Sequence, residues 1–408
     1  MWNRIGLIAY FALLCGLGCI TFSIALGQVF LVISIIATAG MLLKERRFPT
    51  LTVGFFFAVA FFCIALATGM LGLDPARSAL KVKRLIWFVA LIPVAATFVT
   101  SMRRVNEILQ AVAVGTGFLV IESCVAKPIL AWLDFRSGEP GAADYWTALI
   151  HRGSITDGQM LMLGVLASLG LFYGRCAAHG KGRFWRILLP LQSLALILSF
   201  KRGAWIGAIG FVMIFITMER GWRYLALVVA VIALAFTIPP VQTRLHDLRS
   251  EMTFEKGGRL TMWFKVAPTL VKEHPWGIGY AALSNDLMRS VAPNVERERR
   301  HLHSNCVQIL VELGWLGLFA YLAWMAKAVV DSGRMVRLAR RQGNRADAIH
   351  AKAILLMLLA LIVNGVVEYN FGDTELITMY AILIGSVGGV VRASGSLPPA
   401  PPEPDAAG

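Results

Sequence analysis

Long runs of apolar residues alternate with short polar or charged stretches along most of the chain. A run of roughly 17 to 25 apolar residues is long enough to cross a bilayer as a helix, which satisfies its own backbone polar groups. The pattern therefore predicts an all-α, polytopic integral membrane protein with about twelve transmembrane helices. The predicted spans are 5–24, 25–43, 51–73, 85–101, 108–132, 158–174, 187–199, 204–218, 224–240, 306–326, 353–370 and 375–391.

The composition supports this class. Of the 408 residues, 57% are hydrophobic and only 15% are charged, whereas a soluble protein carries about 25% charged residues. The first apolar run has no convincing small-residue cleavage site, so we expect a retained helix and not a signal peptide. The six cysteines lie within or at the ends of apolar segments and show neither zinc spacing nor a disulfide framework.

The distribution of basic residues predicts an orientation. If the N-terminus lies in the cytoplasm, each loop on that side is rich in Lys and Arg, as the positive-inside rule requires. The net charge of +15 has two possible origins, these loops or a site for an anionic ligand. The predicted cytoplasmic loops are 44–50, 102–107, 175–186, 219–223 and 327–352.

The same topology divides the chain into four parts. Residues 1–240 contain helices one to nine, and 241–305 form a long external loop with short helices. Residues 306–391 contain helices ten to twelve. The Pro-rich tail 392–408 is expected to be cytoplasmic and disordered.

Two short external segments break the charge rule: 74–84 and the turn that contains Lys201 and Arg202. The long loop is largely exempt from the rule, but short loops are not. An anion bound at the outer surface would account for basic residues that oppose insertion. For 74–84, binding of anionic lipid head groups and a misplaced topology are alternatives. The basic residues of this segment are Arg77, Lys81, Lys83 and Arg84.

Two histidines, His301 and His303, directly precede the tenth span. Because histidine exchanges protons near neutral pH, a histidine at this boundary is a candidate general base; a helix-capping or interfacial role is the alternative. Asn305, Gln308 and Glu312 share one helix stripe, which should face protein or a water-filled cavity. Glu312 lies too far along the helix to orient His303, so we interpret it as structural.

Arg202 and Arg259 are candidates for binding an anion, since the guanidinium fork matches phosphate oxygens and stays charged. Snorkelling toward lipid phosphates is the alternative for Arg202, and a solvated loop charge is the alternative for Arg259. No Asp-x-Asp or comparable acidic cluster occupies an external segment. The sequence therefore favours arginines over a metal ion as the groups that would neutralise a phosphate.

A second polar stripe, Asn364 and Glu368, lies near the end of the eleventh span and continues into Asp373 and Glu375. One of these acids could orient His303, or the acids could pair with the external basic residues. Of these two alternatives, we predict ion pairing.

Two prolines are predicted to distort helices. In 258–272, apolar residues at helical spacing indicate a helix that lies on the membrane or against the bundle, and Pro268 should weaken or kink it. In the fifth span, Pro128 should kink the helix beside Glu122 and Lys127, which are predicted to pair.

These residues resemble the O-antigen ligases (WaaL type), within the O-antigen ligase/polymerase superfamily of bacterial membrane glycosyltransferases. The family pattern is His followed by Asn, Ser or Gln, then nine residues, then Gly-x-x-Gly. Here it reads His303-Ser304, nine residues, and Gly314-Trp-Leu-Gly317. Further similar segments are Ser199-x-x-Arg202-Gly-Ala-Trp205, Gly258-Arg259 with Trp263, and His274-Pro-Trp-Gly-Ile-Gly-Tyr280.

The resemblance implies transfer of a polysaccharide from undecaprenyl pyrophosphate to a sugar hydroxyl of lipid A-core. The reaction would take place on the periplasmic side of the bacterial inner membrane, without a metal or other cofactor and without nucleic acid as a partner. His303 would be the catalytic general base, and Arg202 and Arg259 would bind the pyrophosphate. Further substrate-binding candidates are His301, Lys81, Lys83 and Arg84.

Three other functions remain open. A related O-antigen polymerase would use a second lipid-linked glycan as acceptor, and a related protein O-oligosaccharyltransferase would use Ser or Thr of a periplasmic protein. An anion or lipid transporter would use the external arginines only for binding.

Overall fold

The computed structural model describes residues 4–137, 145, 154–178, 182–219, 226, 228–230, 233–234, 236–237, 241–242, 254, 257–295 and 301–395. Within these residues every regular element is helical. The first half contains α1 (Arg4–Cys19), α2 (Ile24–Glu45), α3 (Val53–Leu71), α4 (Pro75–Phe98), α5 (Met102–Ile121), the π-helix η1 (Glu122–Ala126), α6 (Lys127–Ser137), α8 (Ile155–Ala177), α9 (Arg183–Leu198) and α10 (Arg202–Met218). The remaining elements are α13 (Arg259–Thr261), the π-helix η2 (Met262–Val266), α14 (Ala267–Glu273), α15 (Asn285–Val291), α16 (Asn305–Arg341), α17 (Arg345–Val367), the 3-10 helix η3 (Asn370–Gly372) and α18 (Thr374–Gly395).

The predicted all-helical fold is confirmed for this part of the chain, and the helices are consistent with a polytopic membrane protein. Each predicted span coincides with a helix except 224–240, most of which lies outside the described residues. Seven described helices are long and apolar enough to cross a membrane, namely α2, α3, α5 with its continuation to Ser137, α8, α16, α17 and α18. The number of twelve spans and the periplasmic loop remain predictions. Of the predicted tail, 392–395 belong to α18, and 396–408 lie outside the described residues.

The prediction that 74–84 is a loop is wrong, because this segment forms the first turns of α4. Asp74 caps the helix by accepting a hydrogen bond from the Arg77 backbone N–H at 2.9 Å, and Pro75 occupies the first turn, which needs no proline N–H. Hydropathy detected only the apolar part of this helix, since Lys and Arg propagate a helix well but lower its mean hydropathy.

The same cause shortens two other predicted loops. α5 begins at Met102, so the whole predicted loop 102–107 belongs to its first turns, and α16 continues to Arg341. The predicted loop 327–352 is thereby reduced to the turn at 342–344.

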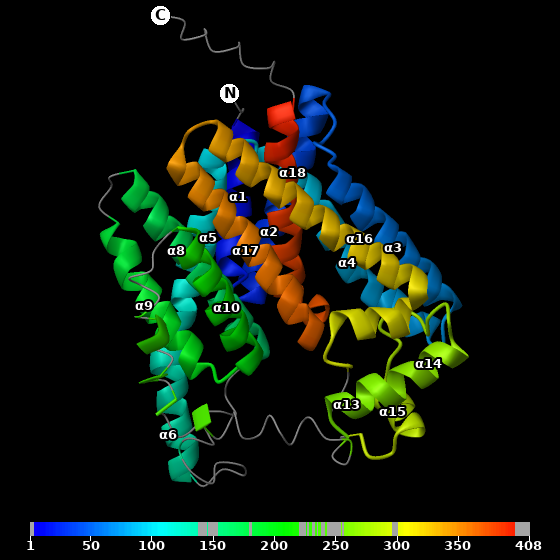
Figure 1. Cartoon of the computed structure of the whole chain (residues 1–408). Coiled ribbons are helices and arrows are strands. Elements are labelled where there is room, and N and C mark those ends of the chain that lie inside the picture. Colours follow the sequence, from blue (N-terminus) through cyan, green and yellow to red (C-terminus); the bar gives the residue numbers. More distant parts are fainter. Residues whose placement is uncertain are drawn as a thin grey trace, which may run out of the picture.

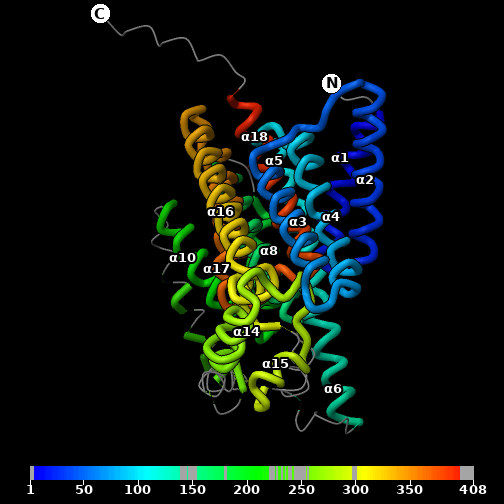
Figure 2. The backbone as a smooth tube through the Cα atoms, turned by 90° about the vertical axis from the view of Figure 1, so that its right-hand side faces the viewer, coloured from blue at the N-terminus to red at the C-terminus, as the bar shows by residue number. Residues whose placement is uncertain are grey.

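The helices form one bundle with two distinct ends (Figure 1). α1 begins and α18 ends at the same end, while α13, α14 and α15 gather at the other, as Figure 2 also shows. In the interior, α18 packs against α4, and α17 packs between α16 and α8. α14 packs against α16, so the helical segment in 258–272 lies against the bundle.

A cluster of aromatic rings centred on Phe371 joins the helices near the end of the bundle where α13, α14 and α15 gather. Its ring centre lies 5.7 Å from those of Phe61 and Phe88, 5.4 Å from that of Tyr321 and 6.1 Å from that of Trp324. These rings come from α3, α4 and α16 and are nearly or fully buried. Large buried aromatic side chains dominate packing energetics, and this cluster fixes where η3 meets α16.

At both prolines that were predicted to distort a helix, the structure has a π-helical turn, which is wider than a regular α-helical turn. η1 directly precedes Lys127-Pro128, and η2 directly precedes Ala267-Pro268. A proline lacks the N–H of a regular helix and clashes with the carbonyl four residues earlier; a π-turn relieves that clash. The predicted pair is also present, with Lys127 Nζ 3.3 Å from Glu122 Oε1 and 2.7 Å from Asp157 Oδ2.

α16 is broken near its start at Gly314, whose φ of 66° and ψ of −169° are not helical. A regular helix would bond the carbonyls of Val311 and Glu312 to N–H groups beyond this point. They instead accept hydrogen bonds from Ile278 N at 3.0 Å and Gly279 N at 2.9 Å. The break therefore ties the turn after α14 to the first part of α16.

The side chain of Glu312 strengthens this connection. Its carboxylate accepts hydrogen bonds from Gln308 Nε2, at 2.8 Å, and from the backbone N–H groups of Ala281 and Leu283. Glu312 is buried, and these contacts give it the structural part that the sequence suggested.

The break predicts that Gly314→Ala destabilises the protein. Only glycine adopts these dihedral angles readily, and forcing another residue into them costs about 1–3 kcal/mol. An added Cβ would also lie 2.6 Å from the Pro275 carbonyl oxygen. The midpoint of thermal unfolding in detergent should fall. Gly333→Ala is the matched control, because Gly333 lies in the same helix with nothing within 4 Å of its added Cβ; an equal decrease in both variants would contradict this account.

Candidate functional site

His303 is held on a firmly anchored backbone at the start of α16. The N–H of the preceding Leu302 donates to Gln308 Oε1 at 2.8 Å, and the Leu302 carbonyl accepts from Trp263 Nε1 at 2.6 Å. Ser304 then caps α16 by accepting from Val307 N at 3.4 Å. His303 itself has a positive φ of 50°, a conformation that is uncommon for residues other than glycine.

The buried carboxylate of Glu368 joins His303 to Arg259. Glu368 Oε2 lies 3.4 Å from His303 Nδ1, and Oε1 lies 2.6 Å from Arg259 Nη2. Arg259 Nη1 also donates to the Val367 carbonyl at 2.5 Å. Glu368 therefore forms the predicted pair with a basic residue, and it also contacts the histidine, which was the alternative.

This contact sets the tautomer of the imidazole. An ionised carboxylate only accepts hydrogen bonds, so His303 Nδ1 carries the proton that it donates to Glu368. In a neutral imidazole the lone pair then lies on Nε2. His303 is only 4% exposed, so its contact with Glu368 is shielded from water.

The electrostatics of Glu368 follow from its partners. Burial by itself raises the pKa of this carboxyl group. The hydrogen bond with His303 and the charge of Arg259 outweigh burial and hold the pKa below its ordinary value. Glu368 is therefore ionised at neutral pH.

Asn305 fixes the segment that follows Glu368. Its Nδ2 donates to Asn370 Oδ1 at 2.6 Å and to Tyr321 OH at 3.2 Å, while its Oδ1 accepts from Phe371 N at 3.0 Å. Asn305 is fully buried. The end of α17 is thus attached to the start of α16, and this attachment keeps Glu368 opposite His303.

Arg202 is the first residue of α10, and this helix starts beside the same carboxylate. A Cβ added to Gly203 would lie 3.6 Å from Glu368 Cγ. The turn before Arg202 is held at the Leu196 carbonyl, which accepts hydrogen bonds from Ser199 Oγ and Trp205 Nε1, both at 2.7 Å. The N-terminus of α10, which favours anions, therefore lies near Glu368, and Arg202 is the first residue of that helix.

His301 lies against His303. The backbone N–H of His303 donates to His301 Nδ1 at 3.3 Å, and the two ring centres are 4.2 Å apart. Accepting this bond requires that His301 Nδ1 be unprotonated. The ring centre of Tyr369 lies 5.7 Å from that of His301.

The basic residues at the start of α4 are less closely associated. Arg84 Nη1 donates to the Gly372 carbonyl at 3.4 Å, four residues beyond Glu368. Lys81 is half-buried and Lys83 is exposed. Neither lysine has a hydrogen bond or ion pair within the described part of the chain.

The arrangement can supply a proton acceptor beside fixed positive charge. His303 would accept the proton, Glu368 would stabilise the resulting imidazolium, and Arg259 and Arg202 would neutralise an anion. Among the residues that the structure describes, no three His, Cys, Asp or Glu side chains gather as a metal site.

Fold and site together define a polytopic membrane protein with a histidine, a carboxylate and arginines at one end of its bundle. Residues 187–322 match the family described as O-Antigen ligase, and this match supports membership of the O-antigen ligase/polymerase superfamily. It also supports glycosyltransferase-like activity on polysaccharide. The matched segment contains Arg202, Arg259 and His303; Glu368 and the start of α4 lie outside it. No match was found among the curated proteins.

Sequence reasoning missed the residues that fix the position of His303, chiefly Trp263 and Gln308. Trp263 was part of the family resemblance, but nothing in the sequence indicated that its indole N–H bonds to Leu302. The polar stripe of Asn305, Gln308 and Glu312 was the available signal, since a polar stripe on a buried helix needs partners.

The lowered pKa of Glu368 predicts a stability effect with a defined pH dependence. Its ionised form stabilises the folded protein above the ordinary carboxyl value of 4.5, and this contribution is lost as pH falls through the lower folded-state pKa. Glu368→Gln should therefore reduce stability at neutral pH by about 3–5 kcal/mol, the cost of removing one partner of a buried ion pair. The deficit, measured by thermal unfolding in detergent, should shrink below pH 4.5.

Asp373→Asn provides the contrast. Burial raises the pKa of the Asp373 carboxyl group, and its hydrogen bond from Thr156 and the charge of Arg84 offset this only in part. Removing this charge should leave stability at neutral pH unchanged or increase it. Equal losses in the two variants would contradict the assignment of Glu368.

Proposed function

We propose that the protein is an O-antigen ligase. It would transfer polysaccharide from undecaprenyl pyrophosphate to a sugar hydroxyl of lipid A-core, at the periplasmic face of the inner membrane. The observation that carries this proposal is the buried contact of Glu368 with both His303 and Arg259. It joins a proton acceptor to a phosphate-binding type of side chain next to the segment that matches the O-antigen ligase family.

In the proposed reaction, the acceptor hydroxyl attacks the anomeric carbon of the donor glycan. His303 Nε2 takes the hydroxyl proton as the new carbon–oxygen bond forms. The bond between the anomeric carbon and the pyrophosphate oxygen breaks, and undecaprenyl pyrophosphate leaves with that electron pair. Arg202 and Arg259 neutralise the negative charge that develops on the leaving group.

Glu368 acts through its neighbours and is a positioning residue. Its carboxylate keeps the Nδ1 proton of His303 in place and favours the imidazolium that forms during transfer. It also holds the Arg259 guanidinium, which therefore combines a structural contact with its proposed part in binding pyrophosphate. Lys81, Lys83, Arg84 and His301 are proposed as further contacts to the lipid phosphates or the acceptor.

The proposed orientation places the His303 end of the bundle in the periplasm and both termini in the cytoplasm. The supporting observation is the concentration of basic residues at the opposite end, where α16 finishes and α17 begins.

Lipopolysaccharide profiling of a deletion strain tests the function directly. A ligase is expected to be required for attaching long polysaccharide chains to lipid A-core, so the ladder should disappear while lipid-linked polymer accumulates. Loss of the polymer itself would instead identify a polymerase. The purified protein should also join lipid-linked polysaccharide to lipid A-core without nucleotide or metal. If it binds both lipids but does not join them, this result would favour a transport function.

His303→Ala should lower the rate of transfer by about 10²–10⁴-fold, the usual contribution of a general base. Folding and binding of the lipid-linked donor should remain. The assay is transfer between purified lipid-linked polysaccharide and lipid A-core. His274→Ala is the control, because His274 is a partly exposed histidine at the end of α14. Near-normal transfer by His303→Ala would remove histidine base catalysis from the proposal.

Arg202→Lys and Arg259→Lys should each raise the KM for the lipid-linked donor. Lysine keeps the charge but loses the guanidinium fork, and a charge-assisted hydrogen bond is worth about 1.5–3 kcal/mol. The expected increase is therefore about tenfold to a hundredfold. Arg289→Lys, in α15, serves as a control for the substitution itself. Unchanged donor kinetics in both site variants would rule out a pyrophosphate clamp.

A further inference from the structure

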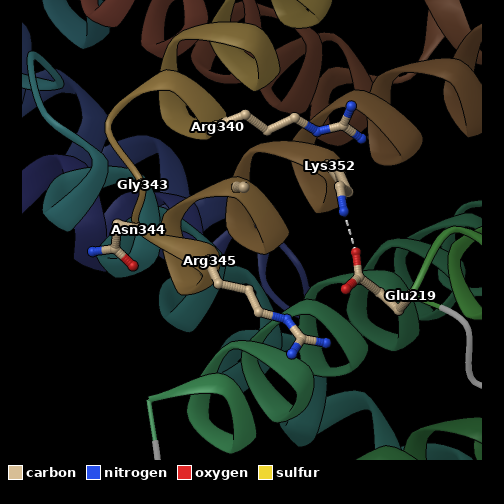
Figure 3. A pocket seen from close by; sticks show the side chains of 7 residues that line it. Glu219, Arg340, Gly343, Asn344, Arg345 and Lys352 are labelled. Atoms are coloured by element: carbon tan, nitrogen blue, oxygen red, sulfur yellow. Dashed lines mark hydrogen bonds and ion pairs between the residues drawn. The ribbon is translucent and has the colours of Figure 1, made fainter. Parts of the chain in front are cut away.

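A cavity lies at the opposite end of the same two helices that carry the candidate site. It has a volume of about 270 Å³ and lies between the end of α10, the end of α16 and the start of α17 (Figure 3). α16 runs from Asn305, beside His303, to Arg341, beside this cavity. α17 connects the same two regions, and at about 1.5 Å per residue its 23 residues span about 35 Å, close to the thickness of a membrane's hydrocarbon core. The lining residues are Glu219, Arg340, Gly343, Asn344, Arg345, Ala348 and Lys352.

The cavity carries an excess of positive charge. Its one carboxylate, Glu219, is paired with Lys352, and the two side chains are only 4% and 9% exposed. Arg340 and Arg345 extend on either side of this pair (Figure 3). Neither arginine has an ion pair within the residues that the structure describes. Lys352 therefore neutralises Glu219, and the guanidinium groups of Arg340 and Arg345 remain at the rim of the cavity.

A tight turn brings these two arginines to one cavity. Gly343 has a φ of 71° and reverses the chain between α16 and α17. Asn344 then caps α17 by accepting hydrogen bonds from Ala346 N, at 3.0 Å, and Asp347 N, at 3.3 Å. The positive end of the α17 dipole adds to the potential at this point.

The positive-inside rule accounts for basic residues at this end but not for their convergence. Arg334, Arg337 and Arg341 occupy the same part of α16, yet none of them lines the cavity, and Arg334 pairs with Asp331. Arg345 and Lys352 lie two turns apart on one face of α17. The positive-inside rule would be satisfied equally by arginines on any face of these helices.

The depth of the cavity fits the level of lipid head groups. Lys352 is the last basic residue of α17 before an uninterrupted apolar stretch from Ala353 to Val363. Such a boundary marks where the hydrocarbon core begins. Clusters of Lys and Arg at this level attract anionic lipids, and guanidinium groups bind phosphate oxygens in pairs.

We propose that this cavity binds the phosphate group of an anionic phospholipid through Arg340 and Arg345. The volume is below the range of about 300–1,000 Å³ that holds drug-sized ligands, so it fits a phosphate ester and not a sugar nucleotide. The site is separate from the proposed transfer site and does not depend on it. Free phosphate would present the same chemistry, and the experiment separates the two sources.

The test measures thermal unfolding of the full-length protein, purified in a neutral detergent, against increasing concentrations of short-chain phosphatidylglycerol. Phosphatidylcholine and inorganic phosphate are the comparison ligands. The doubly substituted variant Arg340→Gln with Arg345→Gln should bind phosphatidylglycerol at least about tenfold more weakly. Arg337→Gln with Arg341→Gln removes the same charge from exposed positions outside the cavity and should bind like the unsubstituted protein.

Each outcome decides the proposal. Equal stabilisation of both variants by phosphatidylglycerol, or stabilisation of none, overturns it. Inorganic phosphate that matches phosphatidylglycerol, with the same dependence on Arg340 and Arg345, would reassign the site to free phosphate and overturn the lipid. If the glutamine pair does not fold, the variant Arg340→Lys with Arg345→Lys decides, because losing the fork should still weaken binding and unchanged affinity would contradict the proposal.

Discussion

A carboxylate that is buried at the end of a membrane helix must find positive or hydrogen-bonding partners, and Glu368 imposes this constraint on the candidate site. Removing its charge from water is unfavourable unless the charge is paired. Arg259 and His303 provide that pairing from two segments far apart in sequence. The long segment between α10 and α16 is therefore connected to the bundle by an electrostatic requirement as well as by apolar packing.

The break at Gly314 meets a second requirement of the same kind. Carbonyls that a helix releases within a buried region need other donors, and the backbone of Ile278 and Gly279 supplies them. The Gly-x-x-Gly element of the family resemblance begins at this break. The first glycine of this element, Gly314, is thus needed for the backbone geometry, independently of catalysis. The break at this glycine fixes the short helical piece that carries His303 at its start.

α16 and α17 connect two chemically different ends. At one end they hold a histidine in contact with a buried carboxylate; at the other they hold arginines around a small cavity. In α17 the stretch from Ala353 to Val363, between the two ends, carries no charged residue. An anion bound at the arginine end would stabilise the helix pair without entering the proposed transfer reaction.

The sequence alone determined the all-helical membrane class, because apolar runs longer than a bilayer is thick have few other solutions. It also selected His303, Arg202 and Arg259 through a family resemblance, and it identified Glu368 as one of several acids that could meet them. It placed 74–84 in a loop, since hydropathy does not detect the part of a helix that is rich in Lys and Arg. Only the tertiary structure decided that Glu368 contacts both His303 and Arg259, that Trp263 and Gln308 hold Leu302, and that Arg340 and Arg345 share a cavity. Contacts between segments distant in sequence depend on how helices pack, and local patterns of hydrophobicity and charge do not specify that packing.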